Sequence, residues 1–214
     1  KLVFSTDSFV IDPYIFPGGD IGKLAVCGTV NDVAMSGGEP KYLSLAAIIE
    51  EGFPMDDLDR IIDSVRDTAI KAGVQVVTGD TKVVEKGKGD GIYLNTAGIG
   101  FLRHPGLAPE RIRKGDKVIV SGTIGDHGTA IMLARNPGLL GGEIKSDCAP
   151  LNGLAARLRV LEDDLRVMRD PTRGGVATVL CEFAEGSQLT IELDEKNFPV
   201  NPTVMGACDI LGLD

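Results

Sequence analysis

The chain lacks the excess of lysine and arginine that a nucleic-acid-binding surface requires. Its 214 residues include 22 Lys and Arg against 31 Asp and Glu, which gives a formal net charge of −9 at pH 7. Because phosphate backbones and anionic membrane surfaces attract positive charge, this balance disfavours both nucleic acid and membrane surfaces as partners.

The chain also lacks a long apolar run. A membrane-spanning helix needs roughly 20 predominantly apolar residues, and the longest run here lies near residues 46–49. No signal peptide is visible. The sequence starts without Met, inside the strand-like Leu2-Val3-Phe4, so we expect it to be part of a longer protein.

Paired cysteine motifs are absent as well. The four cysteines, Cys27, Cys148, Cys181 and Cys208, show no C-x-x-C spacing and lie far apart in the sequence. Nothing beside Cys148 resembles an activating base. The spacing favours buried thiols in a reducing compartment, and we expect a cytoplasmic protein.

The hydrophobic fraction of 43% suits one large or two small globular domains. Residues 104–109 have the composition of a linker, which predicts a first domain over 1–103 and a second over 113–214. The predicted fold class is α/β, with an α+β first domain and an α/β second domain.

In the first domain the pattern predicts helices and strands in alternation. Asp20 is a candidate cap for a helix over 21–36, and an apolar stripe at helical spacing predicts a second helix over 55–72, ended by Gly73. The predicted strands cover residues 2–11, 40–50, 74–82 and 93–102.

In the second domain the predicted elements are shorter. Two buried strands are expected over 117–122 and 189–193. Helices are expected from 128 to about 135, over 151–161, from 175 to 184 and over 202–211.

The stretch Thr78-Gly79-Asp80-Thr81-Lys82 ends one of the predicted strands. Side chains alternate along a strand, so Val74, Val76, Thr78, Asp80 and Lys82 should share a face, with Asp80 and Lys82 about 7 Å apart. A carboxylate and an ammonium side by side can bind a metal and position a substrate proton. They can also be nothing more than an ion pair.

Two nucleotide-binding motifs are tested and rejected. Residues 17–24 resemble a P-loop, but Pro17 takes the place of the first glycine and Leu24 that of the metal-binding hydroxyl. The pair Gly98-x-Gly100 is followed by Arg103 where a dinucleotide fingerprint has its third glycine.

Carboxylates offer another route to a nucleotide. Asp7, Asp32 and Asp80 lie at or near the ends of three predicted elements. Mg²⁺ prefers oxygen ligands and bridges carboxylates to substrate phosphates, although aspartates also commonly cap helices and turns. A shared metal site and three separate caps both remain open at this point.

Two further loops open onto predicted helices. Asp126 precedes one helix. It either caps that helix or lies beside free N–H groups that hold an anion. Arg173 with Gly174 and Gly175 precedes another, where a guanidinium and free N–H groups would make a phosphate cradle.

Six motifs together carry a family resemblance. In chain order they resemble the aminoimidazole-ribonucleotide-synthetase-related ATP-binding superfamily, over essentially the whole chain. The forms around Asp80, Asp126 and Arg173 are similar to those of the HypE family, the carbamoyl dehydratases of nickel–iron hydrogenase maturation. The motifs are Thr6-Asp7-Ser8, Pro17-Gly18-Gly19-Asp20-Ile21-Gly22, Thr29 to Gly38 with Asn31-Asp32 inside, Thr78-Gly79-Asp80-Thr81-Lys82, Gly125-Asp126-His127-Gly128 and Asp170-Pro171-Thr172-Arg173-Gly174-Gly175.

The resemblance implies a binding site for ATP and Mg²⁺. It implies that Asp7, Asp32 and Asp80 hold the metal–nucleotide complex and that Lys82 acts on the substrate, as a base or as an electrostatic positioner. The further residues that it implies at ATP are Asn31, Thr78, Gly79, Asp126, Thr172, Arg173, Gly174 and Gly175.

The implied reaction converts a C-terminal cysteine S-carboxamide to a thiocyanate, the source of the iron cyanide ligands. ATP phosphorylates the amide oxygen, which is otherwise a poor leaving group. The implied partners are a second copy, joined through the sheets of the first domains, the carbamoyltransferase HypF and the HypC–HypD complex. Alternatives are a selenophosphate synthetase or aminoimidazole ribonucleotide synthetase, or a non-catalytic maturation scaffold.

The chain departs from the family pattern at both ends. It has no C-terminal cysteine, no Asn-Glu-Gly element and no glycine-rich N-terminus. We therefore expect these 214 residues alone to fold and dimerise without turning over.

Overall fold

The computed structural model describes residues 1–138 and 144–212. Its first half is built on a four-stranded sheet with the strand order β1-β6-β4-β5. The first two neighbouring pairs are antiparallel and β4 runs parallel to β5. The strands are β1 (Leu2–Phe9), β4 (Gly38–Glu50), β5 (Gln75–Val84) and β6 (Ile92–Leu102).

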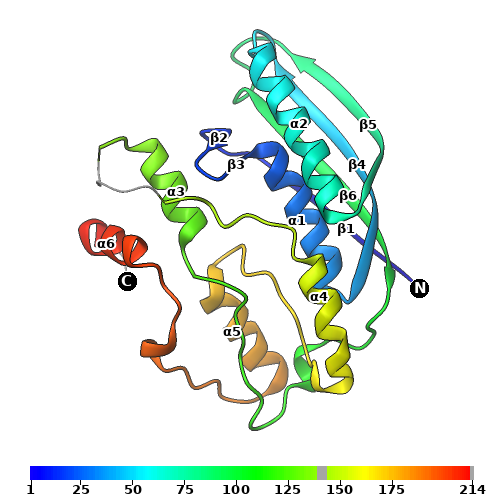
Figure 1. The fold of residues 1–214 in the computed structure, drawn as a ribbon, viewed down its shortest axis with the longest axis vertical. Helices are drawn as coiled ribbons and strands as arrows, with labels where there is room; N and C mark the ends of the chain where they lie inside the picture. Colours follow the sequence, from blue (N-terminus) through cyan, green and yellow to red (C-terminus); the bar gives the residue numbers. More distant parts are fainter. Residues whose placement is uncertain (139–143, 213–214) are drawn as a thin grey trace.

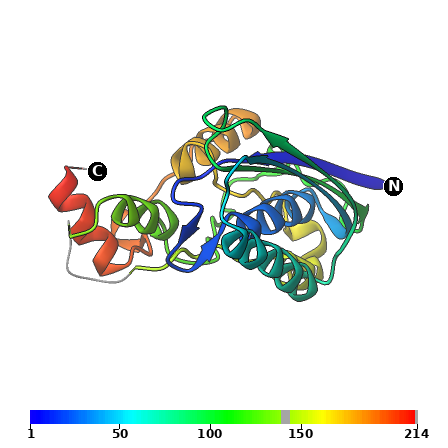
Figure 2. The same ribbon diagram turned by 90° about the horizontal axis from the view of Figure 1, so that it is seen from above.

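Two helices cover one face of this sheet, as Figures 1 and 2 show. Helix α1 (Ile21–Met35) follows a small hairpin of β2 (Ile15–Phe16) and β3 (Gly19–Asp20), and Asp20 caps it by accepting a hydrogen bond from the Lys23 N–H. Helix α2 (Met55–Ala72) is the crossover between β4 and β5, and it ends at Gly73, whose φ is +69°. The predicted cap and stop residues are confirmed.

The core lies between these helices and the sheet. Ile21, Val26 and Val30 of α1 are fully buried, and α2 contributes Ile61 and Val65. The helices approach closely at Gly22, where a Cβ atom would lie 2.6 Å from the Ile61 carbonyl oxygen. A larger residue at this position would therefore separate the two helices.

The opposite face of the sheet carries no helix within the described residues (Figure 2). Several large apolar side chains lie exposed on it. Its side chains come from β1, β4 and β6, and 40–67% of each is exposed: Leu2, Phe4, Tyr42, Ile48, Ile99 and Phe101. We call this surface the open sheet face. Isolated exposed apolar residues are common, but a contiguous patch of this kind marks an interaction surface.

Strand β5 contains an irregularity that the simple alternation of side chains misses. Leu43 pairs with Val76, but Ser44 pairs with Thr78, so Val77 is an extra residue in the ladder. The predicted single face for Val74 through Lys82 is therefore wrong, because a bulge exchanges the two faces. Thr78, Asp80 and Lys82 lie on the open sheet face with Ser44 and Ile48.

The second half is mainly helical. It contains α3 (Asp126–Arg135), α4 (Asn152–Leu158), α5 (Gly175–Ser187) and α6 (Pro202–Leu211), with 3-10 turns at Pro109–Arg111, Arg159–Asp164 and Glu195–Asn197. The predicted helix over 151–161 is thus an α-helix followed by a 3-10 segment. Residues 139–143 and 213–214 of the predicted second domain lie outside the described residues.

The two strands predicted in this half are not formed. Residues 117–122 and 189–193 have no regular structure, and the side chain of Ile119 is 84% exposed. A strand needs a partner for its backbone hydrogen bonds, and the described residues offer only one isolated bridge here, between Ile124 and Val200. Apolar composition alone predicted these strands wrongly.

No helix in the described residues is long and apolar enough to cross a membrane.

The structure of the core predicts that alanine substitutions of two neighbouring isoleucines differ sharply in their effect on stability. Ile61 is 2% exposed and Ile62 is 53% exposed. We expect Ile61→Ala to lower the free energy of unfolding by about 2–4 kcal/mol, because it leaves a cavity between α1 and α2. The matched control Ile62→Ala should cost about 1 kcal/mol or less. Urea unfolding measures both, and equal losses would contradict this placement of the core.

Candidate functional site

The two halves of the chain meet at the last turns of α1. Asn31 receives a hydrogen bond at its amide oxygen from the Leu151 N–H, 2.7 Å away, and its amide nitrogen donates to the Ala149 carbonyl oxygen at 3.0 Å. Each end of the amide thus makes one hydrogen bond to the second half, and the predicted contact of Asn31 with ATP stays a prediction. Asn31 therefore holds the start of α4 against α1.

The neighbouring Asp32 brings a second segment of the second half to the same place. The Ser5 hydroxyl of β1 donates to the Asp32 carboxylate at 2.8 Å. On its other side Asp32 lies close enough to Asp170, in the loop before α5, for the two carboxyl groups to interact. Burial, followed by the negative charge of Asp32, raises the pKa of Asp170 from 3.8 to about 6.

Arg173 extends this group toward β1. Its guanidinium lies 3.9 Å from the Asp7 carboxylate and its side chain is 93% exposed. Asp7 belongs to the face of β1 that α1 covers, on the same side as Ser5. The side chains of β1, the end of α1 and the loop before α5 therefore converge at one edge of the sheet.

The loop after Arg173 presents backbone donors. Gly174 and Gly175 have φ values of +71° and +62°, a region that favours glycine. Gly174 is the N-cap of α5 and Gly175 its first residue, and the N–H groups of this first turn have no partner within the helix. The Thr172 N–H, in contrast, already donates to the Asp170 carbonyl oxygen. Helix N-termini of this kind favour anions.

The structure does not bring Asp80 to this group within one chain. Asp80 lies on the open sheet face, whereas Asp7 and Asp32 lie on the face that the helices cover. Asp80 and Lys82 form an exposed ion pair of 3.0 Å, and the hydrogen bond from Lys82 lowers the pKa of Asp80. Among the residues that the structure describes, no three His, Cys, Asp or Glu side chains are placed to hold a metal ion.

The other predicted site residues lie elsewhere. Thr78 and Gly79 are exposed residues of β5 beside Asp80. Asp126 is buried in the first turn of α3 and accepts a hydrogen bond from the Thr123 hydroxyl. Helix α3 packs against β2 and α6. The predicted single pocket is therefore three separate groups in one chain.

Sequence reasoning missed two members of the group at the end of α1. Ser5 shares a face of β1 with Asp7, a relation that period-two alternation shows directly. Asp170 was part of a recognised motif, but its contact with Asp32 joins positions 138 apart in the chain. No local pattern predicts such a contact.

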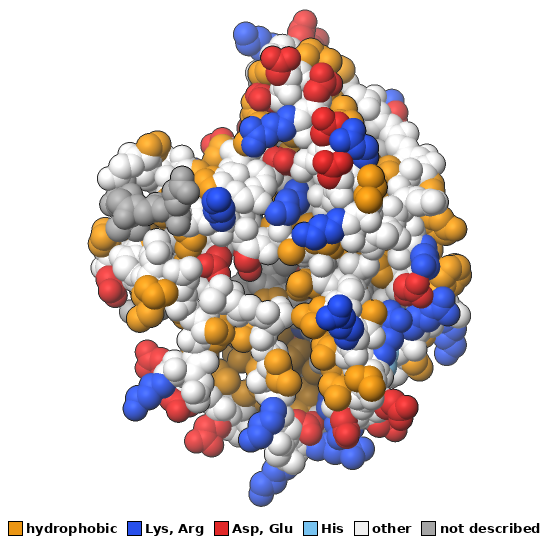
Figure 3. Space-filling model, viewed as in Figure 1, with side chains coloured by type: hydrophobic (Ala, Val, Ile, Leu, Met, Phe, Trp, Pro, Cys, Tyr) orange, Lys and Arg blue, Asp and Glu red, His pale blue; other side chains and the backbone are white. Residues whose placement is uncertain are grey.

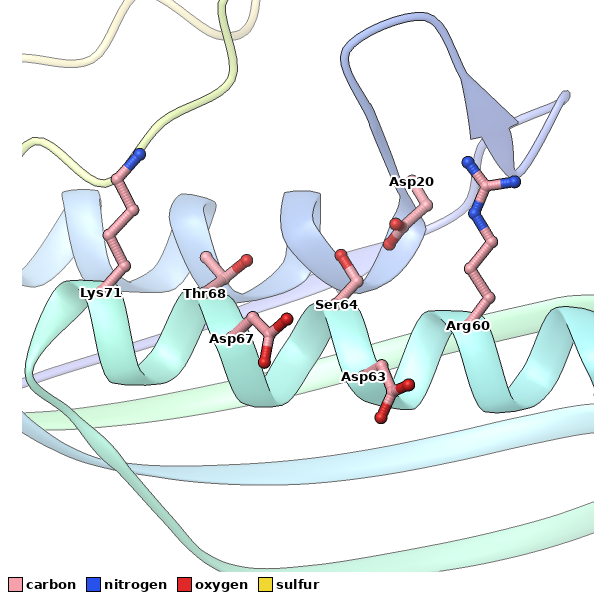
Figure 4. Close-up of a pocket in the computed structure, with 7 residues that line it drawn as sticks. All are labelled: Asp20, Arg60, Asp63, Ser64, Asp67, Thr68 and Lys71. Atoms are coloured by element: carbon pink, nitrogen blue, oxygen red, sulfur yellow. The ribbon is translucent and has the colours of Figure 1, made fainter.

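A shallow polar pocket of about 370 Å³ lies on α2 beside the start of α1 (Figure 4). Residues of α2 line this pocket together with Asp20 at the start of α1, and Figure 3 shows the two signs of charge interspersed over this surface. Asp63 and Asp67 already pair with Arg66. The compensated charges make this pocket a weaker candidate than the end of α1.

The raised pKa of Asp170 predicts a dependence of stability on pH. The folded chain keeps a proton on Asp170 up to about pH 6, whereas the unfolded chain loses it near 3.8. The free energy of unfolding should therefore fall as the pH rises through this interval. Between pH 4 and 7 the free energy of unfolding of Asp170→Asn should fall by about 1–2 kcal/mol less than that of the wild type, because this side chain no longer titrates. Urea unfolding at several pH values measures both proteins. Parallel curves for the two proteins would contradict the contact with Asp32.

Comparison with known proteins places the chain in a family. The N-terminal domain of AIR synthase related proteins matches residues 1–102, and the corresponding C-terminal domain matches residues 113–213. Carbamoyl dehydratase HypE from Rhizobium leguminosarum bv. viciae is 50% identical over the whole chain, and so is HypE from Escherichia coli strain K12. The chain spans 62% and 64% of the length of these relatives.

Solved structures agree with this. The chain superposes on HypE in a HypE–HypF complex with a TM-score of 0.95 and 51% identity, covering 70% of that chain. A solved HypE in complex with ATP superposes with a TM-score of 0.95 at 47% sequence identity, and the match covers 64% of that chain. A thiamine monophosphate kinase from Aquifex aeolicus, at 19% identity, gives a TM-score of 0.75 and shares the fold. The predicted fold is confirmed: the chain belongs to the AIR synthase related family and, within it, to the HypE proteins.

Proposed function

We propose that the chain forms the nucleotide-binding part of an ATP-dependent carbamoyl dehydratase of nickel–iron hydrogenase maturation. The observation that carries this proposal is the pair of carboxylates Asp32 and Asp170 beside an exposed guanidinium and the start of α5. The names of the relatives and the ATP complex of one of them support it.

The donor set fits a magnesium ion. Two carboxylates close enough to raise the pKa of one of them repel each other, and a divalent cation relieves that repulsion. Mg²⁺ is commonly held by one or two carboxylates together with substrate phosphates, so a third aspartate of the same chain is not required. When bound, Mg²⁺ would neutralise the phosphate charge that develops during transfer.

The other residues at this edge have roles in binding. Arg173 and the backbone N–H groups after Gly174 would hold phosphate oxygens through charge-assisted hydrogen bonds. Asp7 orients the guanidinium of Arg173. Ser5 orients the carboxylate of Asp32. The predicted ATP contacts of Thr172, Arg173, Gly174 and Gly175 remain part of the proposal.

The reacting group is proposed to be a cysteine S-carboxamide, converted to a thiocyanate. Transfer of the terminal phosphoryl group to the amide oxygen makes that oxygen a good leaving group, and its loss as phosphate leaves the carbon–nitrogen triple bond after two protons have left the nitrogen. The Lys82 ammonium lies 3.0 Å from the Asp80 carboxylate, which fixes it beside the strand edge. We therefore assign Lys82 to electrostatic positioning of the amide.

A second copy of the chain would bring Asp80 and Lys82 to the site. We propose that two copies join through their open sheet faces, whose exposed apolar residues would be buried in the dimer. Strands β1 and β5 are the opposite edges of the sheet. When two such faces meet about a two-fold axis that runs along the strands, β5 of one copy approaches β1 of the other, which carries Asp7.

Three further expectations stand as proposals. The division into residues 1–103 and 113–214 agrees with the ranges of the two family matches. HypF is a proposed partner, because a relative has been solved with it, and the HypC–HypD complex is proposed from the resemblance alone. A cytoplasmic location fits four free thiols.

The first test removes one carboxylate. In a protein of the relatives' full length, Asp32→Ala should weaken Mg²⁺-dependent ATP binding by about 10–100-fold, because a charged ligand is lost. The control Asp63→Ala lies on the exposed face of α2 and should leave the affinity unchanged. Calorimetry measures the affinity, and mass spectrometry follows the loss of one water mass from a carbamoylated substrate. Unchanged ATP affinity in Asp32→Ala, or no loss of water from the wild type, contradicts the proposal.

The second test asks whether one site uses two chains. Asp32→Ala and Asp80→Ala should each weaken binding by about 10–100-fold as pure dimers, so that at a suitable ATP concentration neither binds. If the aspartates come from different subunits, an equal mixture forms heterodimers with one intact site, and roughly a quarter of the wild-type sites should return. If both aspartates of one chain serve the same site, every site in the mixture carries a substitution and no binding returns.

A further inference from the structure

Two of the four cysteines lie on either side of the contact between the two halves. Lys23, Cys27 and Asn31 are four residues apart on α1, so their side chains share one face of the helix. This face is turned to residues 145–151. Asn31 binds that segment directly, and the Lys23 ammonium donates to the Gly18 carbonyl oxygen at 2.7 Å.

The hydrogen bonds along the segment fix the position of Cys148. At one end the Ser146 N–H donates to the Pro17 carbonyl oxygen at 2.9 Å, and at the other the Leu151 N–H donates to Asn31. The segment therefore runs along α1 from its N-terminal end toward Asn31. Cys148 lies between these two anchors, beside the part of α1 that carries Cys27, and each thiol is close enough to shift the pKa of the other.

The two thiols differ in access and in acidity. Cys27 is 2% exposed, whereas Cys148 is only partly buried. The hydrogen bond from Cys27 lowers the pKa of Cys148, and Lys23 acts in the same direction against the effect of burial. The same hydrogen bond, together with burial, raises the pKa of Cys27. One thiol is thus the accessible nucleophile and the other a protonated neighbour.

We propose that Cys27 and Cys148 are a redox modification site, at which hydrogen peroxide converts the two thiols into an intramolecular disulfide. The Cys148 thiolate attacks one peroxide oxygen, the O–O bond breaks, and hydroxide leaves. The sulfenic acid so formed is attacked by the sulfur of Cys27, the S–O bond breaks, and the departing oxygen leaves as water with the Cys27 proton. The thiols are oxidised by two electrons, which reduce the peroxide.

The bond would lock the junction of the two halves. Cys27 lies about one helical turn before Asn31, so a disulfide adds a covalent link beside its two hydrogen bonds. Residues 145–151 could then no longer separate from α1. The remaining cysteines offer internal controls, because Cys181 lies exposed on α5 and Cys208 lies on α6. The inference does not depend on the proposed function.

The test uses the folded, reduced 214-residue chain and hydrogen peroxide. After oxidation the free thiols are alkylated and the protein is digested for mass spectrometry without reduction. We expect the Cys27 and Cys148 peptides to be joined, with the mass of two hydrogens lost, and Cys181 and Cys208 to be alkylated. Amide hydrogen exchange in residues 145–151 should slow by about tenfold or more in the oxidised chain, because local opening is restricted.

Three variants separate this pair from general oxidation. Cys27→Ser should leave Cys148 as a sulfenic acid that dimedone traps, and Cys148→Ser should abolish the disulfide. The double variant Cys181→Ser/Cys208→Ser should still form it at the wild-type rate. Alkylation of all four thiols after peroxide treatment, or a bond from Cys148 to Cys181, to Cys208 or to another chain, would overturn the proposal.

Discussion

The hydrogen bonds of one amide side chain hold the two halves of the molecule together where its chemistry is concentrated. Asn31 lies on the helix that forms the centre of the first-half core, and it binds the backbone of residues 149–151 at both ends of its amide. A buried or half-buried amide that is fully paired fixes both position and orientation. Asp32 follows directly in the sequence, so the same contact sets where this carboxylate stands.

The electrostatic character of the site follows from that docking. Asp32 comes from the first half and Asp170 from the second, and their proximity is an arrangement that neither half possesses alone. Burial and the nearby charge of Asp32 both disfavour the ionised form of Asp170, and its pKa is raised as a result. Sites that store such repulsion are suited to a divalent cation and to the phosphates it carries. Arg173 and the start of α5 complete the anion-binding side.

Local signals predicted the elements of the first half well. The Asp20 cap, the apolar stripe of α2 and the glycine at its end are each visible in a few neighbouring residues, and all three are confirmed. Alternation along β5 correctly placed Thr78, Asp80 and Lys82 on one face, but it wrongly placed Val76 with them. The bulge at Val77 depends on pairing with β4, which no local pattern shows. The stretch around Ile119 has strand composition, but no partner strand lies beside it in the described structure.

Contacts between distant segments were the other limit. The motifs identified Asp7, Asp32 and the loop around Arg173 as important, and the structure brings these three together. It leaves Asp80 on the opposite face, where the open sheet face gives a physical reason to expect a second copy. Neither the Asp32–Asp170 contact nor the Cys27–Cys148 contact has any signature in the spacing of its residues.

The most direct measurement of the central claim is a crystal structure of the full-length protein with Mg²⁺ and a non-hydrolysable ATP analogue. The account predicts that the metal lies between the carboxylates of Asp32 and Asp170, with the triphosphate at the start of α5. It further predicts that Asp80 reaches this site from the other subunit of the dimer. A triphosphate bound away from the end of α1, with Asp32 and Asp170 both free of metal, would contradict it.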